Sequence, residues 1–334
     1  MTLLENKPLE EIRSLGFPYL SYSDELLKKE MELLINLDSS SIIEDKFIKT
    51  SKSYTKLAST FFPHMFHTRV QGMKTPIEAW NDDKLLQRAI NISKKYSKNP
   101  SMATLRSKLM IVSGTQCVSN FRPDVAKLIY DMYGHNGKIY DFSMGYGGRL
   151  VGFLSSKCEE YVGVDVNKTN FNGYERIKSL YNTNKVTRFI ESGSEHFCEY
   201  ENYFDLAFSS PPYFTKELYS DDSGQSCVLY PDYDIWLDKF LSKTILNIRK
   251  MLKPNGKFAI NIADVNIKSK KYQLVNDCIK LSELNGFKLK NELNYSLKKT
   301  IGTRDSFKCN LQDYKKEPIL IFEKNTNPHF NNFP

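Results

Sequence analysis

Residues 138–149 read KIYDFSMGYGGR, and this stretch decides the fold. The run from Lys138 to Phe142 is typical of a short buried strand, and Leu150, Val151 and Phe153 continue the chain with the apolar spacing of a helix. Glycines between a strand and a helix let the backbone turn sharply and approach a ligand closely. The stretch therefore predicts a strand, a ligand-binding glycine turn and a helix.

Strands and helices alternate on both sides of this turn. Further strands are predicted at residues 160–165, 185–191, 204–208, 257–262, 287–295 and 318–323. A helix is predicted over 124–133 with Pro123 in its first turn, and a long one over about 233–252 that stops at Pro254 to Gly256. This rhythm is typical of a mostly parallel sheet. The predicted fold class is α/β, a Rossmann-like sheet of seven strands with a terminal hairpin.

The first 115 residues have a different character, polar and without strong strand alternation. Ser23 and Asp24 can cap a helix with apolar positions Leu26, Leu27, Met31, Leu33 and Leu34. A second helix is predicted over 83–96, with Leu85, Leu86, Ala89, Ile90 and Ile92 facing inward. We predict a mainly helical accessory region at 1–115 and a second domain at 116–334.

Composition narrows the function classes. The 334 residues include 47 Lys and Arg against 39 Asp and Glu, a net charge of +8 that suits a polyanionic partner without requiring one. The six cysteines form no CxxC pair, which argues against a zinc ribbon, an iron–sulfur cluster and a disulfide scaffold. His64 and His67 have no further ligand nearby in sequence, so no metal is expected. With no apolar run of about 18 residues and no secretory signal at the N-terminus, a cytoplasmic location without membrane contact is expected.

A carboxylate ends the second predicted strand. Asp165 at this position can accept hydrogen bonds from both ribose hydroxyls of a nucleoside. A dinucleotide dehydrogenase would need a third glycine where this chain has Leu150. A glycine turn alone also suits a plain strand–helix connection, but together with Asp165 it predicts nucleoside binding.

The fourth predicted strand, 204–208, runs directly into Ser209-Ser-Pro-Pro-Tyr-Phe214. Here the chain resembles the DNA amino-methyltransferases, which methylate cytosine N4 or adenine N6 with S-adenosylmethionine. Their hallmark is a D/N/S-P-P-Y/F/W tetrapeptide after the fourth strand, which here reads Ser210-Pro211-Pro212-Tyr213. The resemblance covers roughly residues 120–325. It implies a class I methyltransferase sheet, S-adenosylmethionine as cofactor and DNA as partner, with the 1–115 region as a candidate for DNA contact.

The tetrapeptide has the residue types that this chemistry needs. The lone pair of an exocyclic amine is delocalised into the ring, and Ser210 Oγ and the Pro211 carbonyl can accept hydrogen bonds from its two N–H groups. Pro211 and Pro212 fix the backbone without offering competing donors. Tyr213 offers a flat face to an extruded base. No cysteine follows a proline, which excludes the thiolate mechanism of cytosine C5 enzymes.

The resemblance also implies a set of cofactor residues: Asp141, Ser143, Gly145, Gly147, Gly148, Asp165 and Ser194. Many members of the family bind the cofactor adenine with an Asp after the third strand. This chain has Glu191-Ser-Gly-Ser-Glu195 there, which leaves Ser194 or Glu195 for that role. A serine at the first tetrapeptide position is commoner in cytosine-N4 enzymes, so N4-methylcytosine is the first predicted product and N6-methyladenine the second.

Only about sixty residues separate the glycine turn from the tetrapeptide, which leaves no room for a recognition domain between them. Recognition is therefore expected from the N-terminal segment, the polar aromatic loop 215–231 or the basic C-terminal stretch 288–316, although ordinary solvated loops would look the same. The predicted substrate-binding residues are Phe214, Tyr219, Lys298, Lys299 and Arg304. An RNA amino-methyltransferase and a non-catalytic nucleic-acid-binding protein are the alternatives. Monomer and homodimer are equally compatible with the sequence.

Overall fold

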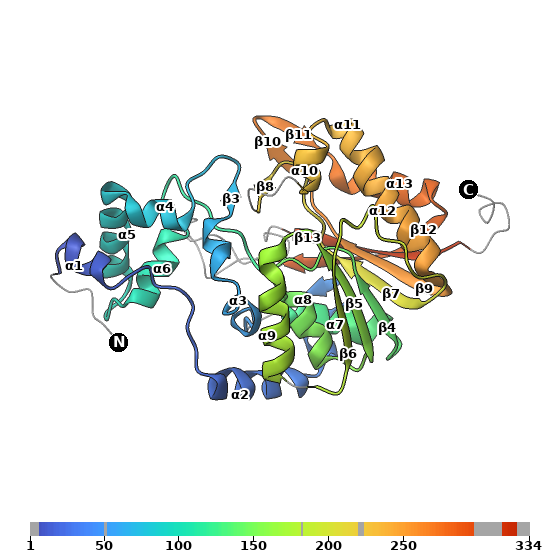
Figure 1. Ribbon diagram of the computed structural model, residues 1–334, viewed down its shortest axis with the longest axis horizontal. Helices are drawn as coiled ribbons and strands as arrows, with labels where there is room; N and C mark the ends of the chain where they lie inside the picture. The colour runs from blue at the N-terminus through green and yellow to red at the C-terminus, as the bar shows by residue number, and fades with distance from the viewer. Residues whose placement is uncertain (1–6, 50–51, 182, 220–223, 297–315, 326–334) are drawn as a thin grey trace.

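The computed structural model describes residues 7–49, 52–181, 183–219, 224–296 and 316–325, and its centre is a nine-stranded sheet (Figure 1). The strand order is β1-β2-β12-β13-β9-β7-β4-β5-β6. The seven strands that follow residue 115 in this sheet are β4 (Lys138–Asp141), β5 (Glu160–Asp165), β6 (Val186–Glu191), β7 (Phe204–Ser209), β9 (Leu252–Asn261), β12 (Phe287–Ser296) and β13 (Lys316–Lys324). Strands β6, β5, β4, β7 and β9 are parallel, and β13 pairs antiparallel with both β9 and β12. The predicted α/β fold, a Rossmann-like sheet that ends in an antiparallel hairpin, is confirmed.

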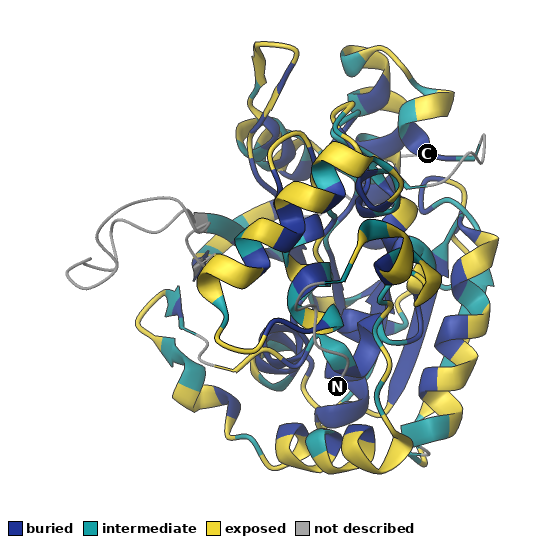
Figure 2. Ribbon diagram, turned by 90° about the vertical axis from the view of Figure 1, so that its left-hand side faces the viewer, coloured by how far each residue is buried: buried dark blue, intermediate teal, exposed yellow. Residues whose placement is uncertain are grey.

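Helices cover both faces of this sheet because its strands are apolar on both sides. In β4, Ile139 belongs to one buried cluster and Tyr140 to another, as the two-residue period of a strand requires. The first cluster is covered by α7 (Pro123–Tyr133), α8 (Gly148–Ser155) and α9 (Phe171–Tyr181). The second is covered by α11 (Tyr233–Trp236), η4 (Leu237–Ser242), α12 (Lys243–Met251) and α13 (Leu274–Leu284). Figure 2 shows the buried residues concentrated between these layers.

Three details of the prediction differ from the structure. The long helix over 233–252 is interrupted by a π-helical segment, η4, between α11 and α12. Strand β9 begins at Leu252 rather than at Lys257, because Leu252 already pairs with Phe204 of β7 before the register shifts. The helices α9 and α13 were not predicted.

The sheet has nine strands rather than seven because the N-terminal region contributes two. Strands β1 (Ile43–Glu44) and β2 (Phe47–Ile48) form a hairpin, and β2 pairs in parallel with β12. Two-residue strands are too short to show a sequence period, which is why the prediction missed them. The early chain is thereby joined to the edge of the central sheet.

The remaining N-terminal elements divide between two cores. The short helices are α1 (Leu9–Ser14), α2 (Asp24–Ile35), η1 (Ser39–Ile42), α3 (Lys56–Ser59), η2 (Pro63–His67), α4 (Pro76–Asn81), α5 (Asp83–Tyr96) and α6 (Met102–Leu109), with the strand β3 (Arg69–Val70) between them. Helices α2 and α3 bury apolar residues against the central sheet, whereas α1, α4, α5 and α6 share a separate core. The boundary near residue 115 therefore stays a prediction.

Both predicted N-terminal helices are present. α2 buries Leu27, Met31 and Leu34 but leaves Leu26 and Leu33 exposed. α5 spans the predicted residues, and its buried positions include Leu86, Ala89 and Ile90. None of the described helices is both long enough and apolar enough to cross a bilayer.

Candidate active site

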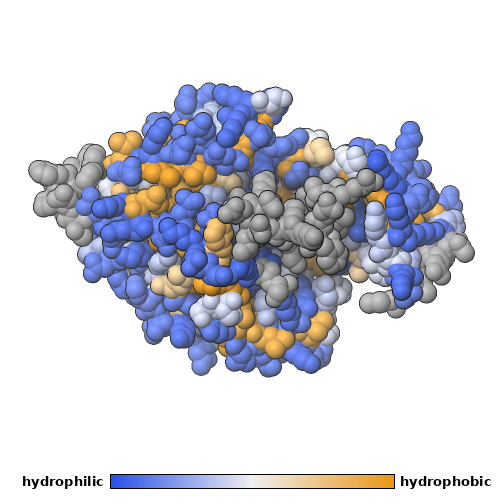
Figure 3. Space-filling model, turned by 180° about the vertical axis from the view of Figure 1, so that it is seen from behind, coloured by the Kyte–Doolittle hydropathy of each residue, from blue (hydrophilic) through white to orange (hydrophobic). Residues whose placement is uncertain are grey.

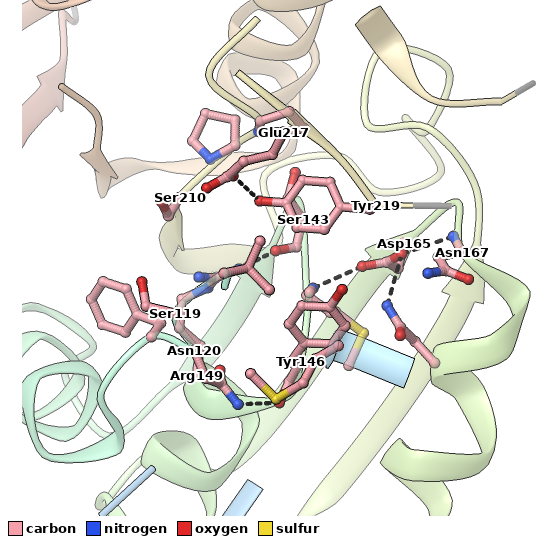
Figure 4. Close-up of a pocket in the computed structure, with 18 of the residues that line it drawn as sticks. Ser119, Asn120, Ser143, Tyr146, Arg149, Asp165, Asn167, Ser210, Glu217 and Tyr219 are labelled. Atoms are coloured by element: carbon pink, nitrogen blue, oxygen red, sulfur yellow. Dashed lines mark hydrogen bonds between the residues drawn. The ribbon is translucent and has the colours of Figure 1, made fainter. Parts of the chain in front are cut away.

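A cavity of about 750 Å³ lies where β4, β5 and β7 end. Ligands of open α/β sheets bind at this edge, beyond the carboxyl ends of the strands. One wall contains the glycine turn and Asp165, and the Ser210–Tyr213 tetrapeptide lines the same space (Figure 4). The opposite wall includes Tyr22, Met65 and Arg106 of the N-terminal region. The volume falls within the range of small-molecule and cofactor sites.

The glycines of the turn serve different purposes. Gly145 lines the cavity with φ +56°, and the nearest atom that a Cβ there would meet is the Ser143 carbonyl oxygen at 4.0 Å. Gly148 is required by packing, because a Cβ there would lie 2.0 Å from the Phe121 carbonyl oxygen. Neither Gly147 nor Gly148 lines the cavity. The predicted contact with the cofactor is therefore favoured at Gly145 and not at the other two.

Asp165 ends β5 and faces the cavity. Its Oδ2 accepts hydrogen bonds from the Gly145 amide at 2.7 Å and the Tyr174 hydroxyl at 3.2 Å, and its Oδ1 accepts from the Asn167 amide at 2.8 Å. Burial of the carboxylate raises its pKa from the ordinary 3.8 to about 6, although these hydrogen bonds oppose the shift. These hydrogen bonds hold the carboxylate in a fixed position. Its burial is unfavourable for the charged form, and hydrogen bonds from the hydroxyl groups of a ligand would offset that desolvation free energy.

Asp141 does not line the cavity, in contrast to its prediction as a cofactor residue. Its fully buried carboxylate accepts hydrogen bonds from Arg149 Nε at 2.9 Å, Tyr161 Oη at 2.6 Å and Ser209 Oγ at 2.7 Å. The amide of Ser143 donates a fourth bond at 3.2 Å. Ser209 directly precedes the tetrapeptide, so Asp141 links the glycine turn to the residues that follow β7.

The two candidates for adenine recognition, Ser194 and Glu195, lie in the turn after β6 and have different surroundings. The Ser194 hydroxyl lies 2.8 Å from Thr244 Oγ1 and is used in packing against α12. Glu195 is 3% exposed and lines the cavity, and its Oε2 has no hydrogen-bond partner among the described residues. Burial raises the pKa of Glu195. A buried polar atom without a partner is rare, and here it favours Glu195 over Ser194.

The tetrapeptide follows β7 and all four of its residues line the cavity. Ser210 Oγ lies 3.4 Å from the Tyr213 hydroxyl, which also lies 3.4 Å from the Asn261 carbonyl oxygen. Burial raises the pKa of Tyr213 well above its ordinary value, so the phenol stays neutral. Lys216 Nζ lies 5.3 Å from the centre of the Tyr213 ring. A polar acceptor and an aromatic ring thus meet at one point of the cavity.

Phe214 does not reach the cavity, although substrate contact was predicted. Its backbone has φ +55°, an uncommon conformation for a bulky residue that turns the chain sharply after the tetrapeptide. The ring packs against Tyr233, Trp236 and Tyr272 at centroid distances of 5.3, 5.8 and 5.4 Å. Phe214 therefore fixes the end of the tetrapeptide through packing with these aromatic rings, outside the cavity.

Tyr219, a predicted substrate-binding residue, lines the cavity together with residues of the N-terminal region. Strand β8 (Glu217–Leu218) pairs antiparallel with β3. The Tyr219 hydroxyl donates to Glu217, and the Tyr219 and Tyr146 rings lie 6.0 Å apart. Lys298, Lys299 and Arg304 lie outside the described residues.

Several cavity residues were not predicted. Tyr146 lies between two glycines of the turn, and Asn167 and Asn170 follow Asp165; the two asparagines had a usable signal, since they come just after a strand-end carboxylate. His64 Nε2 lies 2.7 Å from Asn170 Oδ1. His67 Nε2 lies 3.3 Å from the Tyr19 hydroxyl, so each histidine has its own partner.

Comparisons with known proteins agree with this geometry. Residues 204–333 match a family model described as DNA methylase (N6_N4_Mtase). The predicted resemblance to the DNA amino-methyltransferases is thus confirmed for this part of the chain, and with it S-adenosylmethionine as the cofactor. The match supports methyl transfer as the reaction class. No curated protein matches the sequence.

Solved structures resemble the fold at low identity. TrmN from Thermus thermophilus is 12% identical, with a TM-score of 0.41 over 61% of this chain and 49% of TrmN, so the chain spans about half of that protein. A methyltransferase from Pyrococcus furiosus is 16% identical, with a TM-score of 0.41 over 72% of this chain and 98% of its own. A Burkholderia thailandensis N1-methyltransferase with bound 1,6-didemethyltoxoflavin and S-adenosylhomocysteine is 12% identical, with a TM-score of 0.41 over 61% and 78% of the two chains. At these values the neighbours say nothing about the substrate of this chain.

Proposed function

We propose that this chain, whose residues 204–333 match the DNA methylase family, transfers a methyl group from S-adenosylmethionine to an exocyclic amino group of a base in DNA. Cytosine N4 is the first candidate target and adenine N6 the second. One observation carries the proposal: the Ser210–Tyr213 tetrapeptide lines the same cavity as Gly145 and Asp165. Groups suited to an amine and groups suited to a nucleoside therefore share one cavity.

The residues of the first wall fit the cofactor. Asp165 offers a carboxylate to the ribose hydroxyls, and Gly145 lets the backbone approach without a side chain. The unpartnered Oε2 of Glu195 supports a role for this carboxylate as the acceptor of a hydrogen bond from the adenine amino group. Ser143 also lines this wall. When bound there, S-adenosylmethionine supplies an activated methyl group.

The tetrapeptide prepares the amine. Ser210 Oγ and the Pro211 carbonyl accept hydrogen bonds from its two N–H groups, which draws the nitrogen toward tetrahedral geometry. The prolines contribute no N–H donor that would compete for these acceptors. A paired base inside a duplex cannot present its amine to the cavity, so the target base must leave the stack. The neutral Tyr213 ring then offers this extruded base a face on which to stack.

Transfer of labelled methyl from S-adenosylmethionine to unmethylated genomic DNA and to total RNA, followed by nucleoside mass spectrometry, tests the proposal. We expect N4-methylcytosine in the DNA. N6-methyladenine would keep the class and change the base. Label in RNA alone would replace DNA by RNA as the substrate, and label in neither polymer, despite bound cofactor, would contradict the proposal.

A further inference from the structure

One segment of the N-terminal region is basic throughout. Residues 84–123 contain no Asp or Glu and eight basic residues, namely Lys84, Arg88, Lys94, Lys95, Lys98, Arg106, Lys108 and Arg122. The net charge of these 40 residues, +8, equals that of the whole chain. The basic stretch 288–316 is balanced by acidic residues elsewhere, so that the remainder of the chain holds 47 − 8 = 39 basic and 39 acidic residues.

Helices α5 and α6 carry most of this charge on their surface. Lys84, Arg88 and Lys95 follow one another at helical spacing on the exposed side of α5, opposite the buried Leu86, Ala89 and Ile90. Lys94 and Lys98 are also exposed. Among the described residues, none of these five cations forms an ion pair with a carboxylate. We call the five the α5 cationic face.

The other two arginines of the segment, Arg106 and Arg122, form hydrogen bonds or ion pairs within the protein. Arg106 donates to the backbone carbonyls of Pro18 and Tyr19, and Arg122 pairs with Asp124 at 2.9 Å. The acidic residues just before the segment are also engaged, because Asp83 pairs with Arg13 at 2.6 Å. The unpaired charge is therefore confined to the outer side of the helix pair.

The α5 cationic face adjoins the cavity through α6. Arg106, Ser107 and Met110, which lie in α6 or directly after it, line the cavity wall opposite the glycine turn. The helices pack on α4 and α1 around their own core, which gives the charged surface a rigid support. In Figure 2 this end of the molecule faces the viewer and presents many exposed residues, and in Figure 3 the same end, at the right, is largely hydrophilic.

An exposed aromatic residue stands beside these charges. Tyr96 is 63% exposed, and Lys95 Nζ and Lys108 Nζ lie 5.4 and 5.9 Å from its ring centre. Two ammonium groups around one ring present a site for a negatively charged group. The apolar side of α5 is already buried in its own core, which leaves no apolar face for insertion into a membrane surface.

We propose that the α5 cationic face binds the phosphate backbone of the duplex DNA whose target base enters the cavity. This inference rests on the proposed function, because it takes the substrate to be DNA. A group of exposed cations without acidic partners suits a polyanion such as a phosphate backbone. These contacts position the duplex and carry no base specificity, so they determine affinity and its dependence on salt.

The test compares two doubly substituted variants that lose the same charge. R88Q/K95Q removes two cations of the α5 cationic face, and K28Q/K29Q removes two exposed cations of α2, which packs against α3, α8 and α9 instead. Binding to a 30-base-pair duplex is measured from 50 to 300 mM KCl by fluorescence anisotropy. The cofactor dissociation constant is measured for each protein as a check on folding.

For R88Q/K95Q we expect duplex affinity at low salt to fall about tenfold or more, and the slope of log K against log salt to shrink by about 1.8, two contacts of about 0.9 each. K28Q/K29Q should match the unsubstituted protein, and cofactor binding should be unchanged in both. Equal affinities and slopes for the two variants, with cofactor bound normally, would overturn the inference.

The proposed function and the proposed DNA-binding surface can be contradicted independently of each other. If the unsubstituted protein methylates DNA but R88Q/K95Q behaves like K28Q/K29Q, the proposed function stands and the surface is wrong. If methyl label enters RNA alone and R88Q/K95Q loses affinity for a 30-nucleotide RNA but not for the duplex, the commitment to DNA is overturned.

Discussion

The two walls of the cavity are built in different ways. The cofactor wall consists of residues at the ends of the neighbouring strands β4, β5 and β6, namely Ser143, Gly145, Asp165 and Glu195. The other wall takes Tyr22 and Arg106 from the N-terminal region, before the first long parallel strand, β4. The positions of the residues in the cofactor wall follow from the order of the strands. The positions of those in the other wall depend on how the irregular N-terminal segment packs. The cofactor wall should therefore govern cofactor binding alone, whereas substitutions in the other wall should affect the substrate or the stability.

The largest effect is expected at the tetrapeptide, which faces both walls. Tyr213→Ala removes the stacking face and should lower methyl transfer at least a hundredfold, while the cofactor dissociation constant changes little. Transfer rates with saturating DNA, together with calorimetric titration of S-adenosylmethionine, measure the two quantities. Normal turnover would remove the tetrapeptide from the proposed mechanism.

Tyr213→Phe is the matched control for this variant. It keeps the ring and removes only a hydroxyl whose two nearest partners lie 3.4 Å away. Activity within a few-fold of the unsubstituted protein is expected, because contacts of this length are weak. A loss as large as that of the Ala variant would assign the function to the hydroxyl and not to the ring.

The next largest effect is expected at Asp165. Asp165→Asn should weaken S-adenosylmethionine binding by about one to two orders of magnitude, since a hydroxyl donor loses a charged acceptor. Glu191→Gln is the control, because Glu191 ends the neighbouring strand β6 but pairs with Lys168 at 3.0 Å on the surface. If both variants bind the cofactor equally well, Asp165 does not hold the ribose.

The raised pKa of Asp165 should make both the stability of the protein and its cofactor affinity depend on pH, in opposite directions. Its value of about 6 exceeds the ordinary 3.8, so the folded cofactor-free protein binds this proton more readily than the unfolded chain. The contribution of Asp165 to stability therefore falls as pH rises from about 4 to 6. Cofactor affinity should instead fall below pH 6, where the acceptor becomes protonated. Thermal midpoints and titrations of the unsubstituted protein and Asp165→Asn between pH 5 and 7.5 test both trends.

The same contrast explains what the sequence could predict. Gly145, Asp165 and Ser210 follow strands with clear apolar runs, and parallel strands bring their carboxyl ends to one edge. The sequence could not distinguish Asp141, which has the right position but is used in a buried network. It also could not reveal β1, β2 or the pairing of β3 with β8, because two-residue strands have no period.

A smaller effect is expected at Ser209, which joins the two motifs. Ser209→Ala removes the 2.7 Å hydrogen bond from its hydroxyl to Asp141, while Arg149 and Tyr161 still hold that carboxylate. We expect kcat to fall about tenfold with little change in cofactor affinity, since one buried hydrogen bond is worth about 1–3 kcal/mol. Pre-steady-state methyl transfer and cofactor titration separate these quantities. A loss confined to cofactor affinity would show that Ser209 supports the glycine turn and not the tetrapeptide.

The smallest effect is expected on the free energy of unfolding, from the hydrogen bond between Thr68 of the N-terminal region and Tyr146 of the glycine turn. Thr68 Oγ1 lies 2.5 Å from the hydroxyl of Tyr146, and both residues are buried. Thr68→Val keeps the shape but leaves the Tyr146 hydroxyl unpaired, so the free energy of unfolding in urea should fall by about 1–2 kcal/mol. Thr187→Val is the matched control, because Thr187 Oγ1 is buried with no partner among the described residues and its removal should cost nothing. Equal stabilities of the two variants would mean that the N-terminal wall rests on the glycine turn through apolar packing alone.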